Sequence, residues 1–202
     1  MCIRDSISSL GLVPDVRAVV TVDLKREGDL LYIVGETRAE LGASLYYRLH
    51  GALGNDVPAP VPEAIETMRA LHRAIGRGLV HACHDLSEGG LAVAAAEMAL
   101  AGRLGLDLAL ASLPRSPRVE RNDQALFAES SGRFLVEVAS GDGAAFEKMM
   151  ASVPYARLGR VNREGLFRMH GLQGEIVVHC TIGDLCRAWH GEQTMNVGGR
   201  DQ

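Results

Sequence analysis

The sequence predicts an α/β fold, more closely an α+β mixed-sheet sandwich. Apolar β-rich runs alternate with segments of helical periodicity along most of the 202 residues. The alternation lacks the strict βαβ regularity of a doubly wound parallel sheet, so we expect strands of both directions in one sheet. Hydrophobic residues make up 47% of the chain, which is enough to build a sizeable core.

The composition argues against several functional classes. Lys and Arg number 21 against 25 Asp and Glu, and they are dispersed, so the chain has no nucleic-acid-binding footprint. No apolar run approaches the roughly 18 residues that span a membrane, and the N-terminal residues lack the apolar core of a signal peptide. The four cysteines show no paired-ligand spacing, which indicates reduced thiols in a cytoplasmic protein.

The first elements predicted are strands. Residues 17–23 and 30–35 are β-rich runs, and the polar residues 25–29 between them predict a hairpin. Residues 38–50 predict a short helix.

A linker and a helix are expected next. Residues 51–62 contain three prolines and two glycines, so we place a linker and domain boundary at residues 51–61. Pro62 fits the first position of a helix that ends near residues 76–78. Its apolar stripe consists of Ile65, Met68, Leu71 and Ile75. His72 lies on the same face, and we expect it to be a hydrogen-bonded histidine at the core edge rather than a ligand.

The second half of the chain alternates regularly between strands and helices. Strands are predicted at residues 79–83, 105–110 and 134–138, with two or three more between 155 and 179. Helices are predicted at residues 91–101, 119–129, 143–153 and 181–189, the last capped by Thr181 or Gly183. Residues 191–202 are expected to form a loose tail.

The most informative stretch is residues 84–91, His-Asp-Leu-Ser-Glu-Gly-Gly-Leu. A strand followed by a turn and a helix start allows backbone N–H groups to face an anion. Asp85 and Glu88 would equally suit a carboxylate version of a capping box. Gly89 and Gly90 lower helix propensity by about 1 kcal/mol each, which favours a role in close backbone approach. Two interpretations follow: a ligand-facing turn, or a well-capped helix that packs tightly.

The same predicted strand carries several residue types that can bind a metal. His81, Cys83, His84 and Asp85 are a dense group of ligand types, but strand alternation places His81 and Cys83 on one face and His84 on the other. No second ligand pair stands at zinc spacing elsewhere. We therefore expect no metal site, with Cys83 as a small buried hydrophobe.

A second polar stretch, residues 129–134, has the sequence Glu-Ser-Ser-Gly-Arg-Phe. It is either a polar turn with a bend at Gly132 or a rim of donors and acceptors near the glycine turn. The chain has no Walker A loop, Rossmann fingerprint or Gly-x-Ser-x-Gly elbow. Asp85, Glu88 and Glu129 could hold a phosphate only through Mg²⁺ or another cation, since bare carboxylates repel it.

The order of these motifs resembles the C-terminal end of the phosphoribosylformylglycinamidine synthase family, within the aminoimidazole ribonucleotide synthetase-like superfamily. The resemblance covers about residues 10–189. The motifs that carry it lie at residues 15–17, 28–29, 41–47, 84–91, 96–99 and 129–134.

The resemblance implies an ATP-dependent ligase of purine biosynthesis. Such enzymes phosphorylate the amide oxygen of formylglycinamide ribonucleotide, and ammonia from a glutaminase partner displaces the phosphate. ATP or ADP and Mg²⁺ are the implied cofactors, and the implied partners are the glutaminase and the N-terminal part of the synthetase. The implied domains are the end of the second ATP-binding domain at residues 1–50, the linker at 51–61, a complete C-terminal domain at 62–190 and a loose tail at 191–202.

The resemblance also implies which residues approach a ligand. No histidine matches the family's general base, so no catalytic residue is expected and the chain is expected to be inactive alone. The positions that face substrate or nucleotide in the family's first half correspond to His84, Asp85, Gly89, Gly90, Glu129 and Ser130. Ala43 and Leu45 depart from the Gly and Glu common in the family, which argues against a role for that segment. The alternatives are a non-catalytic nucleotide- or partner-binding module and a different ATP-dependent synthetase of the superfamily.

Overall fold

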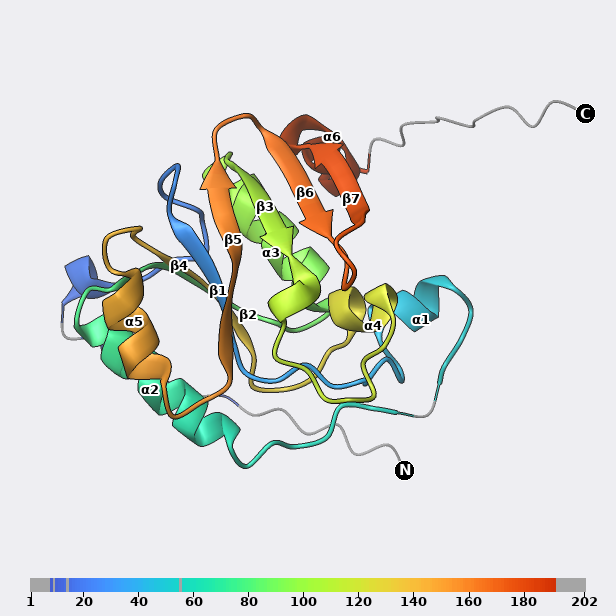
Figure 1. Cartoon of the computed structure of the whole chain (residues 1–202), viewed down its shortest axis with the longest axis horizontal. Coiled ribbons are helices and arrows are strands. Elements are labelled where there is room, and N and C mark those ends of the chain that lie inside the picture. Colours follow the sequence, from blue (N-terminus) through green and yellow to red (C-terminus); the bar gives the residue numbers. More distant parts are fainter. Residues whose placement is uncertain (1–7, 9, 14, 55, 192–202) are drawn as a thin grey trace, which may run out of the picture.

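A seven-stranded mixed sheet forms the centre of the molecule, which confirms the predicted fold class (Figure 1). The structure is a computed structural model that describes residues 8, 10–13, 15–54 and 56–191. The strand order is β2-β4-β1-β5-β3-β6-β7, and all pairs are antiparallel except β3 with β6. The strands are β1 (Leu30–Val34), β2 (Val80–Asp85), β3 (Gly105–Ala109), β4 (Phe134–Val138), β5 (Tyr155–Asn162), β6 (Leu166–His170) and β7 (Ile176–Thr181).

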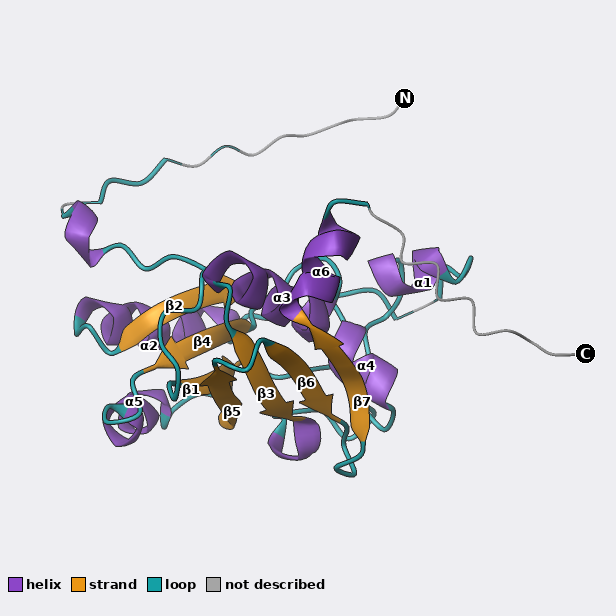
Figure 2. Cartoon of the chain, turned by 90° about the horizontal axis from the view of Figure 1, so that it is seen from above, coloured by secondary structure: helices purple, strands orange, loops and turns teal. Residues whose placement is uncertain are grey.

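Helices cover both faces of the sheet (Figures 1 and 2). They are α1 (Leu45–Leu49), α2 (Ala64–Gly76), α3 (Gly90–Gly102), α4 (Asn122–Phe127), α5 (Gly143–Met150) and α6 (Ile182–Trp189). Short 3₁₀ turns occur at Val16–Ala18 and Leu110–Ser112. α2 and α5 pack on one face, while α3, α4 and α6 pack on the other. Among the helices described, none has the length and apolar character to cross a membrane.

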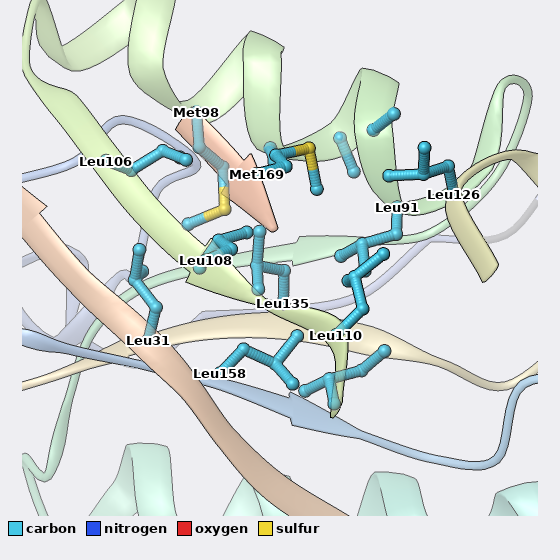
Figure 3. Packing of buried hydrophobic residues seen from close by; sticks show 14 of the residues in the cluster. Leu31, Leu91, Met98, Leu106, Leu108, Leu110, Leu126, Leu135, Leu158 and Met169 are labelled. Atoms are coloured by element: carbon cyan, nitrogen blue, oxygen red, sulfur yellow. The ribbon is translucent and has the colours of Figure 1, made fainter. Parts of the chain in front are cut away.

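Strand β1 contributes to the hydrophobic cores on both faces of the sheet. Leu31 and Ile33 belong to the core under α3, whereas Tyr32 belongs to the core under α2 and α5. Figure 3 shows Leu91 and Met98 of α3 directed toward the sheet in the first of these cores. Burial on both faces explains why β1 reads as an unbroken apolar run rather than as an alternating one.

The position of β1 corrects the expected domain boundary. β1 is hydrogen-bonded between β4 and β5, so residues 30–34 are part of the same sheet as residues 62–190. Residues 51–61 are therefore a loop within one domain rather than a linker between two. Prolines and glycines mark a loop in either case, and only the non-local strand pairing distinguishes the two. The assignment of the residues before β1 to an ATP-binding domain stays a prediction.

Two local predictions near the N-terminus are also wrong. The expected hairpin is absent from the described residues, because residues 17–23 contain only part of a 3₁₀ turn and an isolated parallel bridge from Thr21 to Ala82. The helix expected at residues 38–50 is limited to the five residues of α1.

The buried face of α2 differs from the predicted stripe. Leu71 of that stripe is buried and Ile75 packs against the core, but Ile65 and Met68 are 56% and 50% exposed. The helix also buries Thr67, Ala70 and Ala74. Small side chains allow this helix to lie close to its neighbours, a contact that a stripe of large apolar residues does not reveal. His72 is exposed, so its expected place at the core edge is also wrong. Of the expected tail, residues 192–202 lie outside the described residues.

Candidate functional site

A cleft of about 680 Å³ opens between α2 and the ends of the sheet strands β2 and β4. Apolar side chains of α2, among them Met68 and Leu71, form part of its lining, and Asp85, Ser87, Glu129 and Ser131 supply polar groups. Two of the six residues predicted to bind a ligand, Asp85 and Glu129, therefore line one cleft. The other four predicted residues do not line it.

Glu129 binds the N-termini of two helices. Its Oε1 atom accepts hydrogen bonds from the backbone N–H of Gly89 at 2.8 Å and of Leu45 at 2.9 Å. Gly89 precedes α3 and Leu45 begins α1, so the carboxylate lies where helix dipoles favour a negative charge. The anion at the glycine turn is thus the protein's own side chain. The segment that departs from the family at Leu45 contributes through its backbone.

The two glycines of the turn are required by close packing. Gly89 and Gly90 have φ angles of +77° and +64°, in the left-handed region that favours glycine. A Cβ atom on Gly90 would lie 2.5 Å from the carbonyl oxygen of Ala128. The Gly90 N–H donates to the carbonyl oxygen of Ser87 at 3.1 Å. The turn therefore matches the tightly packed interpretation.

The side-chain caps expected for α3 are not formed. Gly89 is the N-cap residue and has no side chain to cap the helix, and the side chain that binds at this terminus is that of Glu129. Asp85 instead accepts a hydrogen bond from the Ser87 hydroxyl at 2.6 Å. That hydrogen bond lowers the pKa of the Asp85 carboxyl, so it is ionised at neutral pH. The cleft consequently presents acceptor oxygens.

Ser130 and Arg133 hold the loop behind the cleft. The buried Ser130 hydroxyl accepts from the N–H of Arg38 at 3.0 Å and donates to its carbonyl oxygen at 3.2 Å. Arg133 is fully buried and donates from Nε to the Ser130 carbonyl oxygen at 2.9 Å and from Nη1 to Thr37 Oγ1 at 3.0 Å. Burial lowers the pKa of Arg133 to about 10, which leaves the guanidinium charged at neutral pH.

Arg133 was not among the residues predicted to form the site. The sequence contains one signal that points to Arg133: an arginine directly after Gly132, at the start of an apolar strand. An Arg at such a position is buried only when several acceptors surround its guanidinium group.

His84 lies apart from the cleft. Its Nε2 atom is 2.8 Å from Glu97 Oε2, and the two side chains line a second cavity of about 590 Å³ with Arg103 and Trp189. His84 Nδ1 lies 3.4 Å from Asp85 Oδ1, but Asp85 lines the cleft and His84 lines the second cavity. The two residues therefore contribute to different cavities.

The four residues considered as metal ligands do not come together in one group; they are His81, Cys83, His84 and Asp85. Among the described residues, the His, Cys, Asp and Glu side chains that come close enough to share an ion are Asp29, His81 and Glu137. Cys83 is partly buried at the edge of the cleft, and burial raises the pKa of its thiol to about 12. This thiol is protonated at neutral pH, in keeping with its interpretation as a small hydrophobe.

The cleft by itself does not fit a phosphate group. The N–H groups of Gly89 and Gly90 are already used within the protein, and the side chains of Asp85 and Glu129 carry carboxylates. The guanidinium of Arg133 is bound to protein oxygens. Hydroxyl and amide N–H donors fit this lining better than a bare anion does.

Residues 26–171 match the family model described as AIR synthase related protein, C-terminal domain.

Three solved structures with this fold illustrate the similarity. PurL of Thermotoga maritima complexed with FGAR is 22% identical with a TM-score of 0.72, over 84% of this chain and 30% of that chain. Phosphoribosylformylglycinamidine synthase II of T. maritima is 20% identical with a TM-score of 0.69, over 84% and 28%. HypE of E. coli is 21% identical with a TM-score of 0.59, over 80% and 51%. The chain thus spans less than a third of the two T. maritima chains and about half of HypE.

Proposed function

Because this chain belongs to the AIR synthase related proteins, whose C-terminal domain it contains, we propose that it is the C-terminal part of a phosphoribosylformylglycinamidine synthase. The observation that carries the proposal is the order of motifs, with the octet at residues 84–91 and the junction at 129–134, on the fold of this family. Both motifs contribute residues to one cleft. The reaction of that enzyme is the ATP-dependent conversion of formylglycinamide ribonucleotide and ammonia to the amidine, in the cytoplasm.

The cleft would bind the neutral part of the substrate. Formylglycinamide ribonucleotide carries ribose hydroxyls and amide N–H groups, and Asp85, Glu129 and Ser131 offer acceptor oxygens for them. Gly89, Gly90 and Ser130 would act as positioning residues, since they hold Glu129 and its loop in place. The substrate phosphate, ATP or ADP, and Mg²⁺ would be held by the N-terminal part of the synthetase, and a glutaminase partner would supply ammonia.

Titration of the isolated chain with formylglycinamide ribonucleotide, followed by amide chemical shifts, tests this assignment. We expect shifts at Ser87, Ser131 and Gly132, and none at these residues with ATP and Mg²⁺. Ser131→Ala should weaken binding about fivefold, the loss of one ordinary hydrogen bond. The remote Ser116→Ala variant is the control and should bind as the wild type does. The assignment would be contradicted if the amide signals of the cleft residues do not shift. It would also be contradicted if Ser131→Ala and Ser116→Ala bind formylglycinamide ribonucleotide with equal affinity.

A second candidate is a different ATP-dependent synthetase or a non-catalytic module on the same scaffold. The similarity to HypE, which covers about half of that chain, supports this second candidate. The same titration separates the candidates, because only the proposed synthase predicts specific binding of formylglycinamide ribonucleotide in the cleft.

A further inference from the structure

Three side chains with metal-ligating atoms meet near the start of β2, whereas the cleft lies at the end of that strand. Asp29 immediately precedes β1, His81 lies on β2 and Glu137 lies on β4. His81 Nδ1 is 2.6 Å from Asp29 Oδ2, and one ligand atom from each of the three residues lies within 4.8 Å of the others. The neighbouring strands β2, β4 and β1 thus assemble a group from three distant parts of the sequence.

The negative charge of this group is not balanced by the protein. Asp29 is 5% exposed and Glu137 is 0% exposed. Within the part of the chain that the structure describes, neither carboxylate forms an ion pair with a Lys or Arg side chain. The Lys25 ammonium instead contacts Asp23 and Thr21. A cation among the three side chains would supply positive charge to two buried carboxylates.

Backbone N–H groups of Lys25 and Arg26 bind Glu137 but do not saturate it. Oε1 accepts from both at 3.0 Å, whereas Oε2 accepts only from Lys25, at 2.8 Å. Oε2 thus has a single backbone donor, and a ligand atom of Glu137 lies within 4.8 Å of those of Asp29 and His81.

We propose that Asp29, His81 and Glu137 bind one divalent first-row transition-metal cation. One imidazole nitrogen and two carboxylate oxygens form a donor set that Zn²⁺, Mn²⁺ and Co²⁺ accept. The His81 side chain is 22% exposed, which leaves a path for the ion and room for a water ligand. The bound ion ties the loop before β1 to β2 and β4. This site is independent of the proposed function.

Titration of the untagged full chain with Co²⁺, after treatment with a chelator, tests the site. The visible absorption of protein-bound Co²⁺ should reach a plateau at one ion per chain, and Zn²⁺ should displace it. His81→Gln should weaken Co²⁺ affinity by about tenfold or more, as loss of a metal ligand does. His170→Gln is the matched control, because His170 also lies near an aspartate, Asp107, whose charge Arg168 already balances. This control should bind Co²⁺ as the wild type does.

Circular dichroism of each variant checks its fold before the titration. If His81→Gln does not fold, Asp29→Asn takes its place, with the same expected loss. A hyperfine-shifted imidazole N–H signal in the Co²⁺-loaded wild type would confirm the histidine ligand. The proposal is overturned if the wild type binds no stoichiometric Co²⁺ or Zn²⁺, if the ligand variant binds as well as the wild type, or if that signal is missing.

Discussion

Replacement of Glu129 by alanine should destabilise the protein by about 2–3 kcal/mol. The change removes the carboxylate, whose Oε1 atom accepts hydrogen bonds from the N–H groups of Gly89 and Leu45. A hydrogen bond to a charged group contributes roughly 1.5–3 kcal/mol. The two bonds share one oxygen and Glu129 is partly exposed, so water recovers some of the loss and the two contributions do not add fully. Glu129→Gln keeps an acceptor oxygen and should cost about 1 kcal/mol, because it loses only the charge at the start of α3.

Urea unfolding followed by circular dichroism measures these differences, and amide hydrogen exchange locates them. In Glu129→Ala the amides of Gly89 and Leu45 should exchange faster than in the wild type. Glu88→Ala is the control: Glu88 is exposed on the same turn, so its loss should change stability by no more than about 0.5 kcal/mol. The reasoning is refuted if Glu129→Ala unfolds within about 0.5 kcal/mol of the wild type and both amides keep their protection.

Three further predictions concern the surroundings of the cleft. Gly90→Ala should cost about 3 kcal/mol in urea unfolding, because its Cβ meets a backbone carbonyl at a positive φ, whereas Gly141→Ala, which meets open space, should be nearly neutral. Arg133→Lys should cost about 2–3 kcal/mol by the same measurement, since an ammonium cannot replace the guanidinium fork; equal stability would contradict the burial argument. Alkylation of Cys83 by iodoacetamide at about pH 8 should be roughly a thousandfold slower in the folded chain than in urea, because burial raises its pKa to about 12 from 9.0; equal rates would show that the thiol is not buried.

Most strands and helices could be predicted because their signals are local. The β-rich run at β4 and the Ala-rich run of α3 each identify one element, and the structure places both near the expected residues. The place of β1 in the sheet could not be predicted in this way, since its partners β4 and β5 lie more than a hundred residues away. Local signals alone therefore predict a domain boundary at the proline-rich residues 51–61, which follow β1.

The candidate site shows the same division between local and non-local information. The sequence identified Asp85 and Glu129 as neighbours of a turn, and the structure places both at one cleft. It could not show that the anion at the glycine turn is Glu129 itself, because that contact spans 40 residues. It also missed Arg133, whose role depends on acceptors supplied by Thr37 and Ser130 after folding.

The engagement of Arg133 by protein oxygens bears on catalysis in the cleft that it helps to line. Phosphoryl transfer is accelerated by preorganised cations around the transferred group. Asp85 and Glu129 line the cleft with carboxylates, and the Arg133 guanidinium is already engaged by the protein. We therefore expect the chain alone not to turn over ATP.

Phosphate release by the isolated chain, in the presence of ATP, Mg²⁺, formylglycinamide ribonucleotide and ammonia, tests this conclusion most directly. We predict a rate equal to that of a heat-denatured sample of the same chain. Release above that background, accompanied by formation of the amidine, would contradict the proposal that these residues depend on another part of a synthetase for turnover.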